Sequence, residues 1–214
     1  MILVCDSSNK LAHLAELNSM FRLRYRVFHE LLQWDVSVQE GWEIDDYDGN
    51  NPIYVLSLDP TTRAVRGALR LLPTSGPNML NNTFPVLLGG KPPIHSGTIW
   101  ESSRFCIDPE ITQNRGSNHV TLAAAELMCG VGALSLAKGV HNVVTVTDVF
   151  LERMFRRMGC PGTRIGNPVR IGTVDAVAID WPVTQTMLST MKVLAGIDGD
   201  IVAPLDEQPV SVAA

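Results

Sequence analysis

The sequence lacks the cysteine and charge patterns that mark metal-binding, disulfide-bonded and nucleic-acid-binding proteins. Its four cysteines, Cys5, Cys106, Cys129 and Cys160, form no CxxC pair, so they indicate neither a zinc site nor a disulfide framework. We expect reduced thiols and a cytoplasmic protein. Lysines and arginines number 17 against 22 aspartates and glutamates, and the net charge of −5 argues against broad contact with nucleic acid.

Long apolar runs and several enzyme signatures are also missing. The most apolar segment, residues 120–140, is interrupted by Glu126 and Lys138, so we expect a buried helix there and no membrane span. The first ten residues contain Asp6 and Lys10 and do not resemble a secretory signal. The sequence has no GxSxG, P-loop or HExxH motif, and its histidines lack ligand spacing. We therefore expect neither a metal nor a cofactor.

Hydrophobic periodicity predicts strands interleaved with helices in one domain, because a chain of this length can enclose a single core. The expected strands cover residues 2–5, 53–58, 64–72, 98–107, 143–147 and 174–180. The expected helices cover residues 10–32, 118–137 and 148–158, and a last one begins at residue 182. This order predicts an α/β (α+β) domain of three layers, with a mixed central β-sheet flanked by helices. We expect the domain to span residues 1–203 and residues 204–214 to form a flexible tail.

Residues 33–52 break this periodicity and are acidic and aromatic. Four carboxylates fall within six residues: Glu43, Asp45, Asp46 and Asp48. They suit a solvated surface, a divalent metal loop, or a receptor for an ammonium or sulfonium cation. The metal interpretation is weakened because the glutamate expected at the twelfth position of a calcium loop is missing. Trp34, Trp42 and Tyr47 favour an organic cation, since aromatic ring faces attract positive charge.

Two charged residues interrupt the strand expected over residues 98–107. Strict alternation would put Glu101 and Ser103 on one face and Arg104 on the other, so the two charges need not pair. One interpretation is that neighbouring elements satisfy both charges. Alternatively, burial could raise the pKa of Glu101 and let it accept a proton, directly or through water.

Two further segments have both an ordinary and a functional interpretation. The polar turn at residues 113–118 is either a helix cap or a site for an anion or a thioester arm. It is similar to the Q/R-x-x-G-x-G/A turn of GNAT acyltransferases, with Asn118 in place of the last small residue. Arg153, Arg156 and Arg157 make either a solvated helix face or a docking site for an acidic partner.

Several separated motifs together resemble the acyl-homoserine-lactone synthases of the LuxI type. They are RYRVF at 24–28, Trp34, EIDDYD at 43–48, GALRLLP at 67–73, Phe84 and WESSRF at 100–105. The resemblance extends from about residue 20 to 180 and implies a GNAT-like fold. It implies synthesis of a quorum-sensing signal from S-adenosylmethionine and an acyl chain carried by acyl carrier protein or coenzyme A. S-adenosylmethionine would then be a substrate and not a cofactor.

The resemblance also implies roles for individual residues. The catalytic set is Glu101, Arg24 and Arg104, with Glu101 as the base; the S-adenosylmethionine set is Phe28, Trp34, Asp45, Asp48 and Arg70. The acyl pocket would include Ser103 and Thr145, and carrier docking would use Arg153 and Arg157. Thr145 is either a donor to a 3-oxo group or an ordinary β-branched strand residue. The alternatives to this function are another GNAT-fold acyl-CoA-dependent N-acyltransferase and a catalytically silent binding protein.

Overall fold

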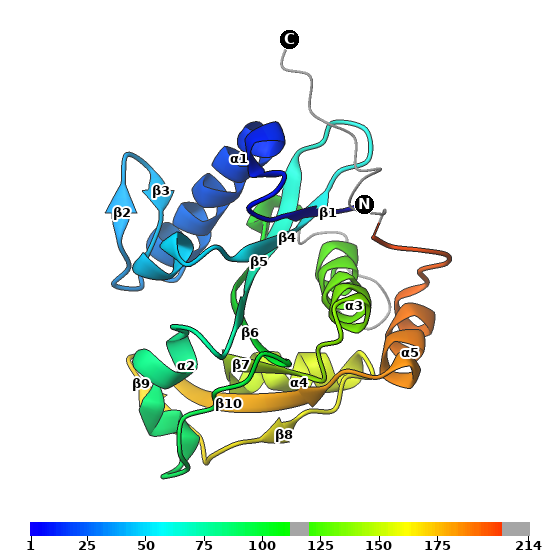
Figure 1. The fold of residues 1–214 in the computed structure, drawn as a ribbon. Helices are drawn as coiled ribbons and strands as arrows, with labels where there is room; N and C mark the ends of the chain where they lie inside the picture. The colour runs from blue at the N-terminus through cyan, green and yellow to red at the C-terminus, as the bar shows by residue number, and fades with distance from the viewer. Residues whose placement is uncertain (112–119, 203–214) are drawn as a thin grey trace.

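The structure is a computed structural model that describes residues 1–111 and 120–202 (Figure 1). The predicted anion-binding turn at residues 113–118 and the predicted tail at residues 204–214 lie outside these ranges. Within the described residues, the main sheet has eight strands in the order β1-β4-β5-β6-β7-β10-β8, and β9 pairs with β10. Neighbouring strands run antiparallel except β6 and β7, which are parallel, so the sheet is mixed as predicted.

The predicted strands are confirmed, and the structure adds short ones that periodicity did not indicate. The main-sheet strands are β1 (Ile2–Cys5), β4 (Ile53–Leu58), β5 (Val65–Pro73), β6 (Ile99–Ile107), β7 (Asn142–Asp148), β8 (Thr163–Arg164), β9 (Val169–Ile171) and β10 (Val174–Pro182). A separate hairpin, β2 (Val38–Gln39) with β3 (Trp42–Glu43), lies in the acidic segment. Strands of two or three residues are too short to show a periodic pattern.

Helices cover both faces of the sheet and make three layers. The first face carries η1 (Lys10–His13), α1 (Leu14–Arg24), η2 (Tyr25–Leu31), η3 (Asp46–Gly49), α2 (Met79–Asn82) and η4 (Pro85–Leu88). The second face carries α3 (Leu122–Ala137), α4 (Val149–Arg157) and α5 (Gln185–Ala195), and a short turn, η5 (Pro109–Ile111), follows β6. The clusters on each face pack apolar side chains against alternate strand residues, as a two-sided sheet requires.

Local signals predicted several helix boundaries correctly, but not all of them. The helix predicted from residue 118 begins as α3 at Leu122, where Thr121 is the cap. Asp148 caps α4 as predicted, because its carboxylate accepts a hydrogen bond from the Leu151 amide at 2.7 Å. The helix predicted from residue 182 begins instead at Gln185, since Pro182 is still paired in β10 and Thr184 provides the cap. The helical segment predicted over residues 10–32 changes from α to π geometry at Tyr25. π-segments are rare and concentrate at functional sites.

The middle of the sheet is irregular in two ways. Strands β6 and β7 pair only from Ile99 to Ser102 and from Asn142 to Thr145, although both continue further. On the other edge of β6 a β-bulge interrupts the ladder to β5, and Arg104 has a φ of 56° there. Glu101 lies one residue before Ser102, the last residue of β6 that pairs with β7, and three residues before Arg104.

Candidate active site

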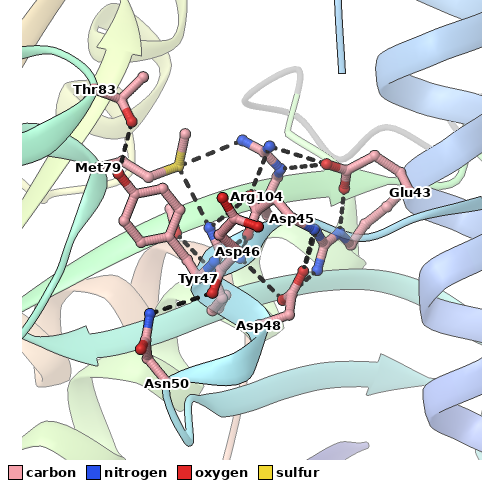
Figure 2. A network of polar contacts seen from close by, with 12 residues as sticks. Glu43, Asp45, Asp46, Tyr47, Asp48, Asn50, Met79, Thr83 and Arg104 are labelled. Carbon is pink, nitrogen blue, oxygen red and sulfur yellow. Dashed lines mark hydrogen bonds and ion pairs between the residues drawn. The ribbon is translucent and has the colours of Figure 1, made fainter. Parts of the chain in front are cut away.

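Three arginines and three carboxylates meet on the first face of the sheet (Figure 2). The six residues are Arg24 from α1, Arg70 from β5, Arg104 from β6, Glu43 from β3, and Asp45 and Asp48 from the segment around η3. We call this group the ion-pair network. Arg24, Glu43 and Arg70 are fully buried, and the opposite charges are equal in number. Mutual pairing offsets the cost of taking these charges out of water.

Arg24 connects α1 to both ends of the acidic segment. Its Nε donates to Glu43 at 2.5 Å, and its Nη1 and Nη2 each donate to one oxygen of Asp48 at 2.9 Å. Burial by itself would raise the pKa of Asp48. The hydrogen bonds and positive charge of Arg24 outweigh that effect, so the pKa of Asp48 lies well below its usual range.

Arg70 ties the same segment to the sheet. Its Nη1 donates to Asp45 and also to Asp48 at 2.9 Å, while its Nε donates to the Ser103 hydroxyl at 3.1 Å. The Tyr54 hydroxyl donates to Asp48 at 2.8 Å. The solvated-surface interpretation is therefore wrong for Asp45 and Asp48, whereas Asp46 is exposed.

Glu101 lies beside this network and is 1% exposed. Its carboxylate accepts hydrogen bonds from the main-chain N–H groups of Met79 at 2.9 Å and Leu80 at 2.5 Å. Burial raises the pKa of Glu101 above its usual value, although these N–H groups and the charges of Arg70 and Arg104 act in the opposite direction. A buried carboxylate with a raised pKa can serve as a general base near neutral pH.

The bulge in β6 brings Arg104 to the same face as Glu101. Arg104 and Phe105 together lie opposite Leu69, so one extra residue is inserted and alternation resumes one position later. Arg104 then donates to Glu43 at 3.0 Å and forms an ion pair with Asp45 at 2.8 Å. The prediction that Arg104 faces away from Glu101 is wrong, because strict alternation does not survive a bulge.

Two of the predicted S-adenosylmethionine residues form an aromatic wall next to the network. Phe28, from the π-segment, stacks on Trp34 with ring centroids 5.3 Å apart and an interplanar angle of 17°. The Arg104 guanidinium lies over the Phe28 ring at 5.5 Å. Phe28 is buried, whereas Trp34 is 40% exposed, so the Trp34 side of this wall is open to solvent.

The two predicted acyl-pocket residues lie on opposite faces of the sheet. Ser103 contacts Arg70 on the first face. Thr145 pairs with Ile179, whose side chain belongs to the cluster beneath α5 on the second face. Both residues nevertheless lie where the pairing of β6 and β7 ends, which is after Ser102 and Thr145.

The basic residues of α4 form no hydrogen bond or ion pair with this network in the described residues, and they are open to solvent. Arg153, Arg156 and Arg157 are all exposed. Arg156 lies 3.7 Å from Glu152, whereas Arg153 and Arg157 have no ion pair within the described residues. Phe150, on the same helix, is 75% exposed. Arg153 and Arg157 follow Phe150 by three and seven residues, so all three side chains lie on one face of the helix.

Sequence reasoning did not identify Tyr54 or Met79 as members of the site. Tyr54 joins it because β4 pairs with β5 in a register that puts Tyr54 opposite Arg70. Met79 joins it because α2 packs against β6. Neither contact leaves a local motif in the sequence, so only the tertiary structure reveals them.

A search of the described residues found no set of three or more His, Cys, Asp or Glu side chains arranged to hold a metal ion. In the same residues, no helix combines the length and the apolar character needed to cross a membrane.

Comparison with known proteins identifies the family of the chain. The family model described as autoinducer synthase matches residues 8–191. An acyl-homoserine-lactone synthase of Agrobacterium fabrum is 43% identical over 163 residues, which are 76% of each chain. The crystal structure of the AHL synthase LasI has a TM-score of 0.77 and 35% identity, covering 89% of this chain and 93% of that one.

Two further solved structures are similar in fold. The CoA-dependent acyl-homoserine lactone synthase BjaI, with SAM and isopentyl-CoA, has a TM-score of 0.81 and 26% identity, covering 93% of this chain and 90% of that one. A structure described as an N-acetyltransferase, from Lactobacillus plantarum, shares only the fold, at 14% identity and a TM-score of 0.57. The GNAT-like architecture is thus confirmed, and the chain belongs to the autoinducer synthase family as an acyl-homoserine-lactone synthase, an acyltransferase.

Proposed function

We propose that Glu101 starts the reaction by removing a proton from the ammonium group of S-adenosylmethionine, directly or through one water. The amine nitrogen then attacks the acyl thioester carbon, the C–S bond breaks, and the carrier leaves as a thiol after its sulfur takes the proton that the nitrogen loses. The carboxylate of the resulting amide next attacks the γ-carbon of the methionine chain, which is bonded to the sulfonium sulfur. That C–S bond breaks and neutral methylthioadenosine leaves, closing the lactone. The observation that carries this proposal is the buried Glu101, with its raised pKa, on the same face as the ion-pair network.

The network and the aromatic wall form the site for S-adenosylmethionine in this proposal. Asp45 and Asp48 provide negative charge toward the sulfonium, but they also hold the three arginines. Phe28 and Trp34 contact the adenosyl and sulfonium parts through their rings. Arg70 is engaged with two carboxylates and Ser103 and holds the segment in place. Arg104, whose Nη1 contacts no carboxylate among the described residues, holds the donor carboxylate.

The acyl chain crosses the sheet in this proposal. Its thioester lies near Ser103 and Glu101, and its tail continues toward Thr145 on the second face, through the region where β6 and β7 no longer pair. Crossing there requires no break in the existing ladder. The Thr145 hydroxyl is available to donate to a 3-oxo group, and its other interpretation, an ordinary strand residue, stays open.

The acyl donor is a thioester of acyl carrier protein or of coenzyme A. Docking of the acidic carrier protein at α4 is supported by exposed Arg153 and Arg157, to which the structure adds exposed Phe150. Coenzyme A is supported by the similarity to BjaI.

We further propose that residues 1–203 form one domain and that the reaction uses its two substrates and no cofactor. We also propose that the protein acts in the cytoplasm, where both substrates are made. The four cysteines are free and buried, which suits a reducing compartment.

The test is mass spectrometry of organic extracts from a host that expresses the wild-type chain, compared with the same host expressing Glu101→Gln. We expect an N-acyl homoserine lactone only with the wild type, together with methylthioadenosine. If S-adenosylmethionine and acyl donors are supplied and an acylated amine forms without methylthioadenosine, the reaction is that of another N-acyltransferase and the proposal is wrong.

A further inference from the structure

Met79 contacts the base and two arginines of the site at once. Its main-chain N–H donates to Glu101 at 2.9 Å. Its sulfur accepts a hydrogen bond from Arg70 Nη2 and another from Arg104 Nη1, each at 3.4 Å. Figure 2 shows the sulfur directed at the Arg104 guanidinium. The side chain is 8% exposed, so this is a buried contact.

The hydrogen-bond donors of the two arginines are used to different extents. A guanidinium has five N–H groups. Arg70 directs all five to Ser103, Asp45, Asp48 and the Met79 sulfur. Arg104 directs its Nε and Nη2 to carboxylates. Its Nη1, which carries two hydrogens, has one acceptor among the described residues, the Met79 sulfur.

A thioether is a weak acceptor, whereas a carboxylate forms a stronger, charge-assisted hydrogen bond. The second hydrogen of Arg104 Nη1 is therefore available to an anionic group of a substrate. Arg104 also has a φ of 56° in the bulge, a conformation that a non-glycine residue keeps only when its surroundings hold it. Glu43, Asp45 and Met79 form hydrogen bonds or ion pairs with the guanidinium, and the Phe28 ring lies against it.

We propose that Met79 is a positioning residue for the acyltransfer reaction, whose sulfur fixes Arg104 Nη1 beside Glu101 so that its second hydrogen receives the carboxylate of the amino donor. This inference rests on the proposed roles of Glu101 and Arg104. The competing explanation is that Met79 only fills space. The two explanations differ in whether turnover depends on the acceptor atom or on the volume of the side chain.

The variants are chosen to separate acceptor from volume. Met79→Leu keeps the main-chain N–H and a similar volume but removes the acceptor. Met79→Gln is unbranched and restores an acceptor oxygen. Met20→Leu is the matched control, because Met20 is a buried residue of α1, 1% exposed, and its sulfur accepts no hydrogen bond in the described residues. Methylthioadenosine release is measured against S-adenosylmethionine concentration and pH, and thermal unfolding is recorded for each variant.

We expect Met79→Leu to lower kcat/KM for S-adenosylmethionine about tenfold, as for the loss of one charge-assisted hydrogen bond. The acidic limb of its pH profile should move to higher pH. The charged groups facing Glu101 are Arg70 from β5 and Arg104 from β6, each bound to Asp45, and a displaced Arg104 lowers the pKa of Glu101 less. Met79→Gln and Met20→Leu should stay within about twofold of the wild type.

Wild-type kcat/KM and an unchanged pH profile in Met79→Leu would overturn the inference. So would equal losses in Met79→Leu and Met79→Gln, since volume alone would then explain both. If Met79→Leu does not fold, near-wild-type turnover of Met79→Gln still supports the acceptor role, and its loss refutes it. Failure of the proposed function is a different result, because the wild type itself would then release no methylthioadenosine.

Discussion

Arg24 and Asp48 meet in a two-point ion pair, with Nη1 and Nη2 each 2.9 Å from one carboxylate oxygen, although 24 positions separate them in the sequence. The Arg24 side chain is fully buried and that of Asp48 is 5% exposed. Such a pair is costly to bury and costly to break, because loss of one partner leaves the other charge without compensation. The acidic segment is therefore held in place by the same residues that form the candidate site.

Asp48→Asn should destabilise the protein by about 3–5 kcal/mol, the usual cost of breaking a buried ion pair. Urea unfolding measures this loss. Asp175→Asn is the control, since Asp175 pairs with Arg170 at 3.3 Å and both side chains are more than half exposed. An exposed pair contributes no more than about 1 kcal/mol. Equal losses in the two variants would contradict the central place of Asp48.

Acid should destabilise the protein through the same residue. The pKa of Asp48 is depressed in the folded state, so its contribution is complete above its unfolded pKa of ~3.9 and is lost as pH falls below that value. The raised pKa of Glu101 acts in the opposite sense. We expect Tm to fall below about pH 4 in the wild type and to fall less steeply in Asp48→Asn. Parallel pH curves for the two proteins would refute this.

Glu101→Gln should reduce turnover about 100-fold or more while leaving the calorimetric affinity for S-adenosylmethionine within a few fold. The amide keeps the shape and one acceptor for the Met79 and Leu80 amides but cannot accept the proton. Glu110→Gln is the control, because Glu110 is 82% exposed and lies outside the site. Turnover near the wild-type rate would remove Glu101 as the base.

Arg157→Glu should raise KM for an acyl chain on acyl carrier protein about tenfold and leave KM for the same coenzyme A thioester within about twofold. The reason is that only the carrier protein has an acidic surface to meet α4. Lys10→Glu makes the same change of charge at an exposed residue before α1 and should affect neither substrate. Equal changes in both KM values would discard docking at α4.

The pattern of neighbouring residues was sufficient to predict much of the fold. Short apolar and β-branched runs marked the strands, three- and four-residue spacing marked the first long helix, and Asp148 marked the start of α4. These features depend on residues that are adjacent in the chain, so a sequence carries them directly. The motifs at residues 24–28, 43–48 and 100–105 likewise identified the family that the comparisons confirm.

Only the tertiary structure decided how the site is assembled. The bulge that turns Arg104 toward Glu101 exists because β6 has one more residue than the part of β5 that it pairs with. The sequence of β6 by itself does not reveal this extra residue. The same holds for Met79, whose place depends on α2 packing against β6. The opposite faces of Ser103 and Thr145 follow from strand register. Register, bulges and buried ion pairs are set by contacts between distant segments, and their energies arise only when those segments have packed together.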